Sequence, residues 1–322
     1  GLLTWKTDGT VAGQAYRATF SAPTTACGVY ADCGKITRLR PNANPNTIYA
    51  FAPDMEIPTS LDSSNVVSGN HAKRINLVND KPYYIPTTFD ADSASFTYTF
   101  PETEDGTKWH ALTMPFESDS ICVDSIPVSL SDTLKHFWIY EFTAEDSKGN
   151  IVFKPVTKLR GGTPYIIAAD SYMAGRSIVF HATDVSFFKT GTDKMLVSSP
   201  GYKFHGNTHA PRLKDCYLMN EEGTAFDYTA TNKLLTGLNS YFTTALSEEL
   251  RLPSIVLPEI PTVQGILGDI NGDTKADIAD AVSVLNIMAA GEFSQIADIN
   301  GDGQIDIADF VSILNIMAGG TE

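Results

Sequence analysis

The chain has 322 residues, of which 43% are hydrophobic and 10% aromatic. This composition excludes a disordered protein, and the chain is long enough for about two domains. Its formal net charge is −15, so it lacks the cationic surface that binding to nucleic acid or an anionic membrane requires. No apolar run approaches the roughly 20 residues that cross a bilayer, and we expect no transmembrane segment.

The N-terminal residues contain no signal segment with a charged start and an apolar core. We therefore expect a processed or trimmed chain whose export signal lies upstream. Cys27 and Cys33 lie close together in a Gly-containing turn, and a disulfide between them is left open. Cys122 and Cys216 lie in apolar stretches, which are typical of buried thiols.

Residues 1–261 have the pattern of a β protein. Residues 95–100 alternate polar and aromatic side chains with a period of two, as a half-buried strand does. Gly, Pro, Asp and Asn interrupt the chain between such stretches, which predicts antiparallel meanders or a β-sandwich, with a division into two subdomains near residue 101. We predict further strands at residues 109–116, 136–142, 151–156, 165–168, 178–181, 216–220, 241–245 and 255–257.

Two stretches of this region resemble surface proteins of Bacteroidales. The first runs from Asn44-Pro-Asn-Thr-Ile-Tyr49 through Asn65-Val-Val67 and Ala72-Lys-Arg-Ile75 to Tyr98-Thr-Phe100, and in those proteins it often follows leucine-rich repeats. The second runs from Trp109–Phe116 through Gly162–Ile167 to Leu218–Phe226. The resemblance covers about residues 40–257. It implies an exported or cell-surface location with a role in adhesion, and it implies no reaction.

Enzyme motifs are missing from the sequence. It contains no Gly-x-Ser-x-Gly, no His-Glu-x-x-His and no Gly-x-x-x-x-Gly-Lys. His205 and His209 flank a turn-like Gly-Asn pair without an obvious third metal ligand. The pairs Glu102 with Glu104 and Glu248 with Glu249 are typical of solvated loop residues. We therefore expect a non-catalytic protein, with a glycan-active enzyme as one alternative.

Carbohydrate binding is a second alternative for the β region. Exposed Trp and Tyr rings bind sugars in lectin-like sandwiches. Trp5, Trp109 and Trp138 supply such rings, but Trp109 and Trp138 lie in apolar strands and are predicted to be buried. Tyr83-Tyr84 lies between two prolines and is the better candidate for a binding platform on a loop.

A proline-rich segment ends the β region. Pro253, Pro258 and Pro261 form a semi-rigid spacer. We therefore place a domain boundary here, with a β-rich module at 1–261 and a second domain at 262–322.

Residues 262–322 contain the same loop-and-helix unit twice, once from Asp269 and again from Asp298. Each loop has acidic or amide side chains at positions 1, 3, 5, 9 and 12 and offers a backbone carbonyl at position 7. Oxygens at this spacing point inward at one hard cation. The twelve residues are Asp269, Asn271, Asp273, Lys275, Asp277 and Asp280 in loop 1, and Asp298, Asn300, Asp302, Gln304, Asp306 and Asp309 in loop 2. We predict that two calcium ions bind here.

The two loops differ at position 6, where the backbone of such a loop is left-handed. Loop 2 has Gly303 at this position, whereas loop 1 has Thr274, whose branched side chain resists that conformation. Loop 1 is therefore predicted to be the weaker site. Helices are expected to follow at 281–291 and 310–320, each ended by glycine.

The region resembles a type I dockerin over residues 265–320. No helix is expected before either loop, and position 12 is Asp where an ordinary EF-hand has Glu. The resemblance implies a cohesin-type partner that contacts loop positions 10 and 11 and helix positions 18 and 19. In this chain these are Ile278, Ala279, Asn286 and Ile287 in the first copy, and Ile307, Ala308, Asn315 and Ile316 in the second.

Two interpretations of these aliphatic positions are open. The four isoleucines either form an apolar docking surface for the partner or pack as core. The sequence thus predicts a mainly β protein, an antiparallel sandwich or meander followed by a small all-α dockerin. It favours a non-catalytic adhesin or scaffold at the cell surface or outside the cell, with a glycan or host surface ligand for the β region.

Overall fold

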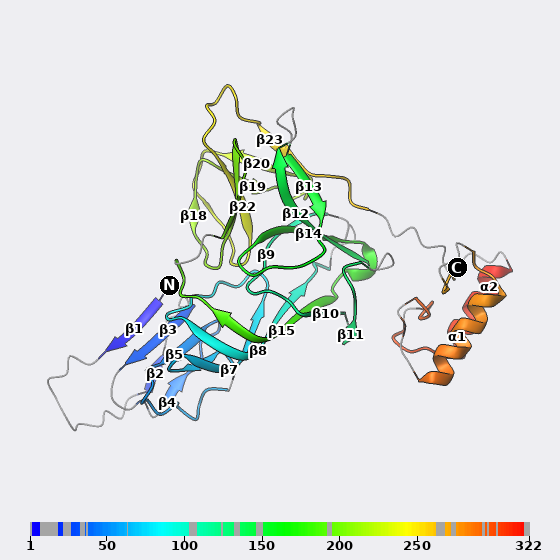
Figure 1. Cartoon of the computed structure of the whole chain (residues 1–322), viewed down its shortest axis with the longest axis horizontal. Coiled ribbons are helices and arrows are strands. Elements are labelled where there is room, and N and C mark those ends of the chain that lie inside the picture. The colour runs from blue at the N-terminus through cyan, green and yellow to red at the C-terminus, as the bar shows by residue number, and fades with distance from the viewer. Residues whose placement is uncertain are drawn as a thin grey trace. The chain divides into compact units, whose positions relative to one another are not determined.

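The computed structural model describes residues 2–6, 19–21, 27–32, 36, 38–62, 64–102, 108–123, 125–131, 136–145, 151–191, 195–261, 268–271, 275–291, 294, 296–300 and 302–318. Within these residues it contains twenty-three strands and two α-helices (Figure 1), so the mainly β prediction is confirmed. The chain divides into two compact units. The first is Gly1–Leu130 with Phe137–Ile260, and the second is Ser131–His136 with Pro261–Glu322. No described helix is long and apolar enough to cross a membrane.

A nine-stranded mixed sheet forms the base of the first unit. In spatial order its strands are β1 (Leu2–Lys6), β3 (Gly28–Asp32), β5 (Ile48–Phe51), β6 (Val66–Ser68), β7 (His71–Val78), β8 (Phe89–Thr99), β15 (Ser177–Phe187), β10 (Ser120–Val123) and β11 (Ile126–Pro127). The first four strands are parallel to one another. From β8 onward the pairs are antiparallel.

The parallel part of this sheet is solenoid-like. Its pairs join Leu2 to Gly28, Gly28 to Ile48, and Tyr49 to Val66, so each turn of the chain is shorter than the one before it. Parallel neighbours require the chain to cross over between strands rather than to reverse at a hairpin. Because the turns differ in length, no fixed repeat marks them in the sequence.

A second pair of parallel strands belongs to the same turns. It consists of β2 (Thr19–Ser21) and β4 (Arg38–Arg40). Val29, Leu39 and Phe51 lie together in one buried cluster. The sequence predicted antiparallel meanders here, and for this part of the chain that prediction is wrong. The chain returns through a second short strand, so consecutive strands of the large sheet point the same way.

Buried asparagine side chains close the ends of these turns. Asn46 is 0% exposed, and its Nδ2 donates to the carbonyls of Val78 and Lys81 at 2.8 Å while its Oδ1 accepts from the Val78 N–H at 2.8 Å. Asn65 has a φ of 59° and its Oδ1 accepts from the Asn76 N–H at 2.7 Å. Because buried polar groups must be paired, these amides fix the end of β7 against the parallel turns.

Two antiparallel sheets follow in the same unit (Figure 1). The four-stranded sheet is β13 (Ile151–Pro155), β12 (Phe137–Glu145), β14 (Pro164–Ala169) and β9 (His110–Thr113), and the six-stranded sheet is β16 (Leu196–Ser198), β17 (Tyr202–Gly206), β22 (Ser240–Thr244), β19 (Cys216–Met219), β20 (Ala225–Thr229) and β23 (Ser254–Val256). Phe142 and Phe153 of the first contact Phe204 and Phe242 of the second, with ring centroids 5.4 to 6.3 Å apart. The two sheets thus share an aromatic core.

The nine strands predicted in this unit are confirmed, with shifted ends. They correspond to β8, β9, β12, β13, β14, β15, β19, β22 and β23. The remaining short elements are β18 (Arg212–Leu213), β21 (Lys233–Leu234) and the 3-10 helix η1 (Ser171–Met173). Period-two alternation identified β8, whose inner face is buried and whose outer face meets water.

The second unit contains the two helices, α1 (Ile278–Ala290) and α2 (Ile307–Met317). Each begins at loop position 10, ahead of the predicted start just after position 12. Gly291 ends α1 with a φ of 65°, as predicted, whereas Ala318 caps α2 and Gly320 lies outside the described residues. A small core of Ala281, Val284 and Ile313, each 0% exposed, joins the helices.

Candidate functional site

The duplicated loops of the second unit form the site that the sequence predicted. Both copies lead directly into a helix, at Ile278 in one and Ile307 in the other. Asp273 and Thr274 of loop 1 lie outside the described residues. The geometry is therefore described for loop 2, and loop 1 repeats it at positions 9 and 12.

Position 12 holds each loop closed. Asp309 is 0% exposed; its Oδ1 accepts from the N–H groups of Ile299 and Asn300 at 2.8 and 3.2 Å, and its Oδ2 accepts from the Asp306 N–H at 2.9 Å. Asp280 is also 0% exposed and makes the same three bonds to positions 2, 3 and 9 of loop 1, at 2.7, 3.0 and 2.8 Å. One carboxylate thus ties the start and the end of each loop together.

Position 9 joins the loop to the helix. Asp277 and Asp306 are the N-caps of α1 and α2, and their Oδ1 atoms accept from the N–H groups of Ala279 and Ala308 at 2.8 and 2.7 Å. With position 12 as the third helical residue, each pair forms a reciprocal capping box. The sequence predicted ligands at these positions, but it did not predict that both carboxylates would cap the helix.

Position 1 organises the middle of loop 2. Asp298 is 7% exposed and accepts from the N–H groups of Asp302 and Gly303 at 3.0 and 2.8 Å. Gly303 has a φ of 82°, which confirms the left-handed backbone predicted at position 6. Asn300 Oδ1 accepts from the Asp302 N–H at 2.9 Å, and Asp302 Oδ1 accepts from the Gln304 N–H at 2.9 Å.

The remaining predicted ligands lie nearer to solvent. Asn271, Lys275, Asn300, Asp302 and Gln304 are exposed, whereas Asp269 is 8% exposed. Each loop therefore has two nearly buried carboxylates, at positions 1 and 12, below a rim of exposed oxygen donors. Within the described residues, no group of three or more His, Cys, Asp and Glu side chains is arranged to hold a metal. In this conformation the carboxylates are directed at loop N–H groups.

The electrostatics of these carboxylates favour a cation. Burial raises the pKa of Asp280, but the N–H donors of Asp277, Asn271 and Ile270 outweigh burial, so its pKa lies below the usual value and the carboxylate is charged. Neither Asp298 nor Asp309 has a Lys or Arg partner among the described ion pairs. Buried charges are normally paired or bound to metal, and the donors here are all oxygens, which suits a hard cation.

An apolar stripe runs along each helix beside the loops. Ile278 and Ile307, at loop position 10, are 61% and 60% exposed. Helix positions one and two turns further on continue the stripe, with Val282 48% and Leu285 40% exposed in α1, and their counterparts Val311 47% and Leu314 36% exposed in α2. Sequence analysis missed these four, although their i, i+4, i+7 spacing places them on one helix face.

The other predicted partner-binding residues divide between surface and core. Ala279, Asn286, Ala308 and Asn315 are exposed. Ile287 is half-buried and packs against the helix core, and Ile316 is also half-buried, close to the backbone of Gly268. The two interpretations of the isoleucines therefore each describe part of the set. Position 10 faces solvent, and position 19 packs inward.

In the β unit, Tyr83 does not form part of the aromatic platform predicted at Tyr83-Tyr84, and Tyr84 is half-buried. Tyr83 is 1% exposed and its N–H donates to the Thr208 carbonyl at 2.8 Å, so it is part of the core rather than a loop surface. Trp109 and Trp138 are buried as predicted, at 2% and 8% exposure. Nothing is described of the Trp5 side chain.

Other candidate groups of this unit do not gather into one site. His205 stacks on Tyr241 with ring centroids 4.9 Å apart and contacts Thr243 Oγ1 through Nε2 at 2.8 Å. Glu248 and Glu249 are exposed, while Glu104 and Cys33 lie outside the described residues. Cys216 is buried as predicted, and Cys122 is only half-buried.

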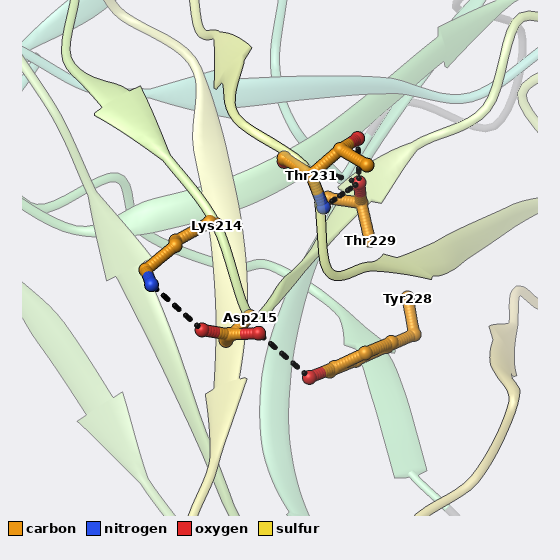
Figure 2. Close-up of polar contacts among 5 residues, drawn as sticks. All are labelled: Lys214, Asp215, Tyr228, Thr229 and Thr231. Atoms are coloured by element: carbon orange, nitrogen blue, oxygen red, sulfur yellow. Dashed lines mark hydrogen bonds and ion pairs between the residues drawn. The ribbon is translucent and has the colours of Figure 1, made fainter.

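One polar cluster lies on the outside of the six-stranded sheet. Figure 2 shows Asp215 between Lys214 Nζ, at 3.7 Å, and the Tyr228 hydroxyl, which donates to it at 3.3 Å. Thr229 and Thr231 bond to each other beside it. The members of this cluster satisfy one another's hydrogen bonds, which is the behaviour of a surface network that fixes a turn.

Comparison with protein-family models, with curated proteins and with solved structures finds no match to this chain.

Proposed function

We propose that the second unit is a calcium-dependent docking module of the dockerin kind, which attaches the β unit to a cohesin-type partner. The observation that carries the proposal is the duplication of both features of such a module. Each copy has an acidic loop closed by a buried position 12 carboxylate, and each presents an exposed apolar helix stripe beside it.

Calcium is supported by the donor chemistry and by the buried charge. Asp269, Asp298 and the two position 12 carboxylates are all less than a tenth exposed. Each carboxylate oxygen has two acceptor directions. At position 12, Oδ1 accepts two N–H groups, whereas Oδ2 accepts one and retains a direction for an ion. A bound calcium ion supplies positive charge to this cluster. Loop 2, with Gly303 in the left-handed conformation, is the better candidate for the tighter site.

Docking is supported by the stripes on α1 and α2. Exposed aliphatic residues at i, i+4 and i+7 are the usual anchors of a helix that binds in an apolar groove. The stripe of Ile278, Val282 and Leu285 recurs at the equivalent positions of α2, so one partner groove fits either helix. Two equivalent stripes on one small unit are more than its own core requires.

The proposal extends to the place and role of the whole chain. Calcium sites of this kind fill where calcium is near millimolar, outside the cell. We therefore place the protein outside the cell or on a cell surface, as a non-catalytic adhesin or scaffold whose β unit is held there by its docking module.

The test uses the full chain with calcium titration and cohesin capture. Isothermal titration is expected to resolve two calcium sites. Asp298→Ala is expected to lower the overall calcium affinity more than Asp269→Ala does. Capture by a panel of type I cohesin domains is expected in calcium and lost in a chelator. Ile278→Asp or Ile307→Asp alone is expected to preserve capture, because the other stripe is intact, and the double variant to abolish it.

Val256→Asp is the matched control, because Val256 is an apolar side chain of the β unit and is 74% exposed. It is expected to leave calcium binding and capture unchanged. A chain that binds no calcium at millimolar concentration, or a double Asp variant that is still captured, would show that the proposal is wrong.

A further inference from the structure

A continuous groove lies in the β unit, away from the duplicated loops. It consists of a cavity of about 580 Å³ and a second of about 300 Å³, which share the lining residues Ile85, Phe188, Met195 and Leu196. The walls come from the end of β15, from the start of β16 and from the end of β17, so elements of two sheets contribute. Ligand sites commonly have this size and lie at such junctions.

The groove is held open by hydrogen bonds between its walls. The segment at Ile85 is fixed by its N–H, which donates to Thr190 Oγ1 at 2.8 Å, and by its carbonyl, which accepts from the Thr190 N–H at 3.1 Å. Just before it, the Tyr83 N–H donates to the Thr208 carbonyl at 2.8 Å. A ligand therefore meets a preformed surface and loses little affinity to ordering it.

Phe188 is the exposed aromatic side chain of this groove. It is 52% exposed, and among the described side chains no other Phe, Tyr or Trp is exposed. Its neighbour Phe187 is 2% exposed and stacks on Phe89 with ring centroids 5.1 Å apart. The backbone at Phe188 is thus anchored in the core while Phe188 itself lines both cavities.

The polar groups of the groove are mainly hydrogen-bond acceptors. Asp119 and Asp184 are exposed carboxylates in the larger cavity. Asn207, which lines the smaller cavity, is 4% exposed, and its buried Oδ1 has no partner among the described residues. Asn207 Nδ2 donates to the Thr236 carbonyl at 2.9 Å, so exchanging the amide O and N would set two acceptors against each other.

The ionisable groups of the groove differ in their partners. Glu117 is paired with Lys158 at 2.5 Å, and Asp119 Oδ2 accepts from the N–H and hydroxyl of Thr183 at 2.8 and 3.2 Å. Burial lowers the pKa of His205 and of His209, so both imidazoles in the smaller cavity are neutral at pH 7. The exposed carboxylates of Asp119 and Asp184 and the neutral imidazoles disfavour phosphorylated ligands.

We propose that this groove binds a neutral oligosaccharide, with one sugar ring packed on Phe188 and hydroxyls donated to Asp184 and Asp119. Sugars combine apolar C–H faces with many O–H donors, which is the complement of one exposed aromatic ring among acceptors. The site lies in the β unit and does not depend on the docking proposed for the second unit. It moves the expected glycan contact from Tyr83 to Phe188.

The test measures binding of neutral hexasaccharides to the full chain by calorimetry and saturation-transfer NMR. The probes are the hexasaccharides of cellulose, starch, mannan and xylan, with a pentalysine peptide as the competing class. At least one hexasaccharide is expected to bind, and Phe188→Ala is expected to weaken it about tenfold. Asp184→Asn is expected to weaken the same probe, and chelation of calcium to leave it unchanged.

Leu250→Ala is the matched control, because Leu250 is 70% exposed and outside both cavities. Each variant is used only if its melting temperature and its near-ultraviolet circular dichroism spectrum equal those of the unchanged chain. The proposal is overturned if none of the hexasaccharides binds at millimolar concentration. It is also overturned by sugar binding that Phe188→Ala leaves intact, and by binding of pentalysine alone.

Discussion

Replacing Asp309 by Ala tests the idea that one carboxylate holds loop 2 and α2 together. The substitution removes three hydrogen bonds, from the N–H groups of Ile299, Asn300 and Asp306. Bonds to a charged acceptor contribute about 1.5–3 kcal/mol each, and water replaces part of that sum, so we expect a loss of about 3 kcal/mol. A module of this size has only about 3–5 kcal/mol of stability, so the second unit is expected to unfold in a large fraction of molecules.

The assay is hydrogen exchange of the full chain, followed by mass spectrometry in millimolar calcium. Amide exchange in 298–317 is expected to accelerate by about a hundredfold, because each 1.4 kcal/mol corresponds to about tenfold. Asp280→Ala is the paired variant and is expected to act first on 269–290. Asp215→Ala, on the surface of the β unit, is the control and leaves both segments protected. Unchanged exchange in Asp309→Ala would refute the reasoning.

Two further predictions concern the β unit and are measured by urea unfolding. Burial, with a contribution from Lys108, lowers the pKa of His110 from 6.5 to about 4, so the unfolded state binds the proton first. The contribution of His110 to the free energy of unfolding is therefore fully present above pH 6.5, and about 3 kcal/mol of it is lost as the pH falls to 4. His110→Gln is expected to remove this part of the pH dependence. The control His71→Gln is expected to retain it. Phe204→Ala is expected to cost about 3–5 kcal/mol because Phe204 is 0% exposed and stacks 4.2 Å from Phe242; a loss below about 1 kcal/mol would contradict the aromatic core.

The antiparallel strands were predictable because their signal is local. In β8, residues 95–99 alternate between more and less buried positions, so the signal lies in consecutive residues of the sequence. The parallel turns carry no such signal. β5 is buried at every position, and each turn is shorter than the last, so neither alternation nor a repeat length reveals them.

The two candidate sites differ in the same way. The loops of the second unit are contiguous, so the spacing of Asp298 to Asp309 predicted the closed turn and the left-handed Gly303. The groove of the β unit joins Ile85, Asp184 and Asn207 from distant parts of the chain, and its identity depends on which aromatic ring the fold leaves exposed. The packing of Tyr83 in the core and the exposure of Phe188 decide which aromatic ring a ligand can contact.

The central pairing of the nine-stranded sheet has a kinetic consequence. β8 and β15 are neighbours over almost their whole lengths, yet Thr99 and Ser177 are 78 residues apart, with β9 to β14 between them. The ladder therefore forms late, because a long loop must close before its contacts are made. Until residue 187 is available, β8 presents an unpaired edge with apolar side chains on one face. During synthesis this edge is a segment of the β unit that is prone to intermolecular pairing.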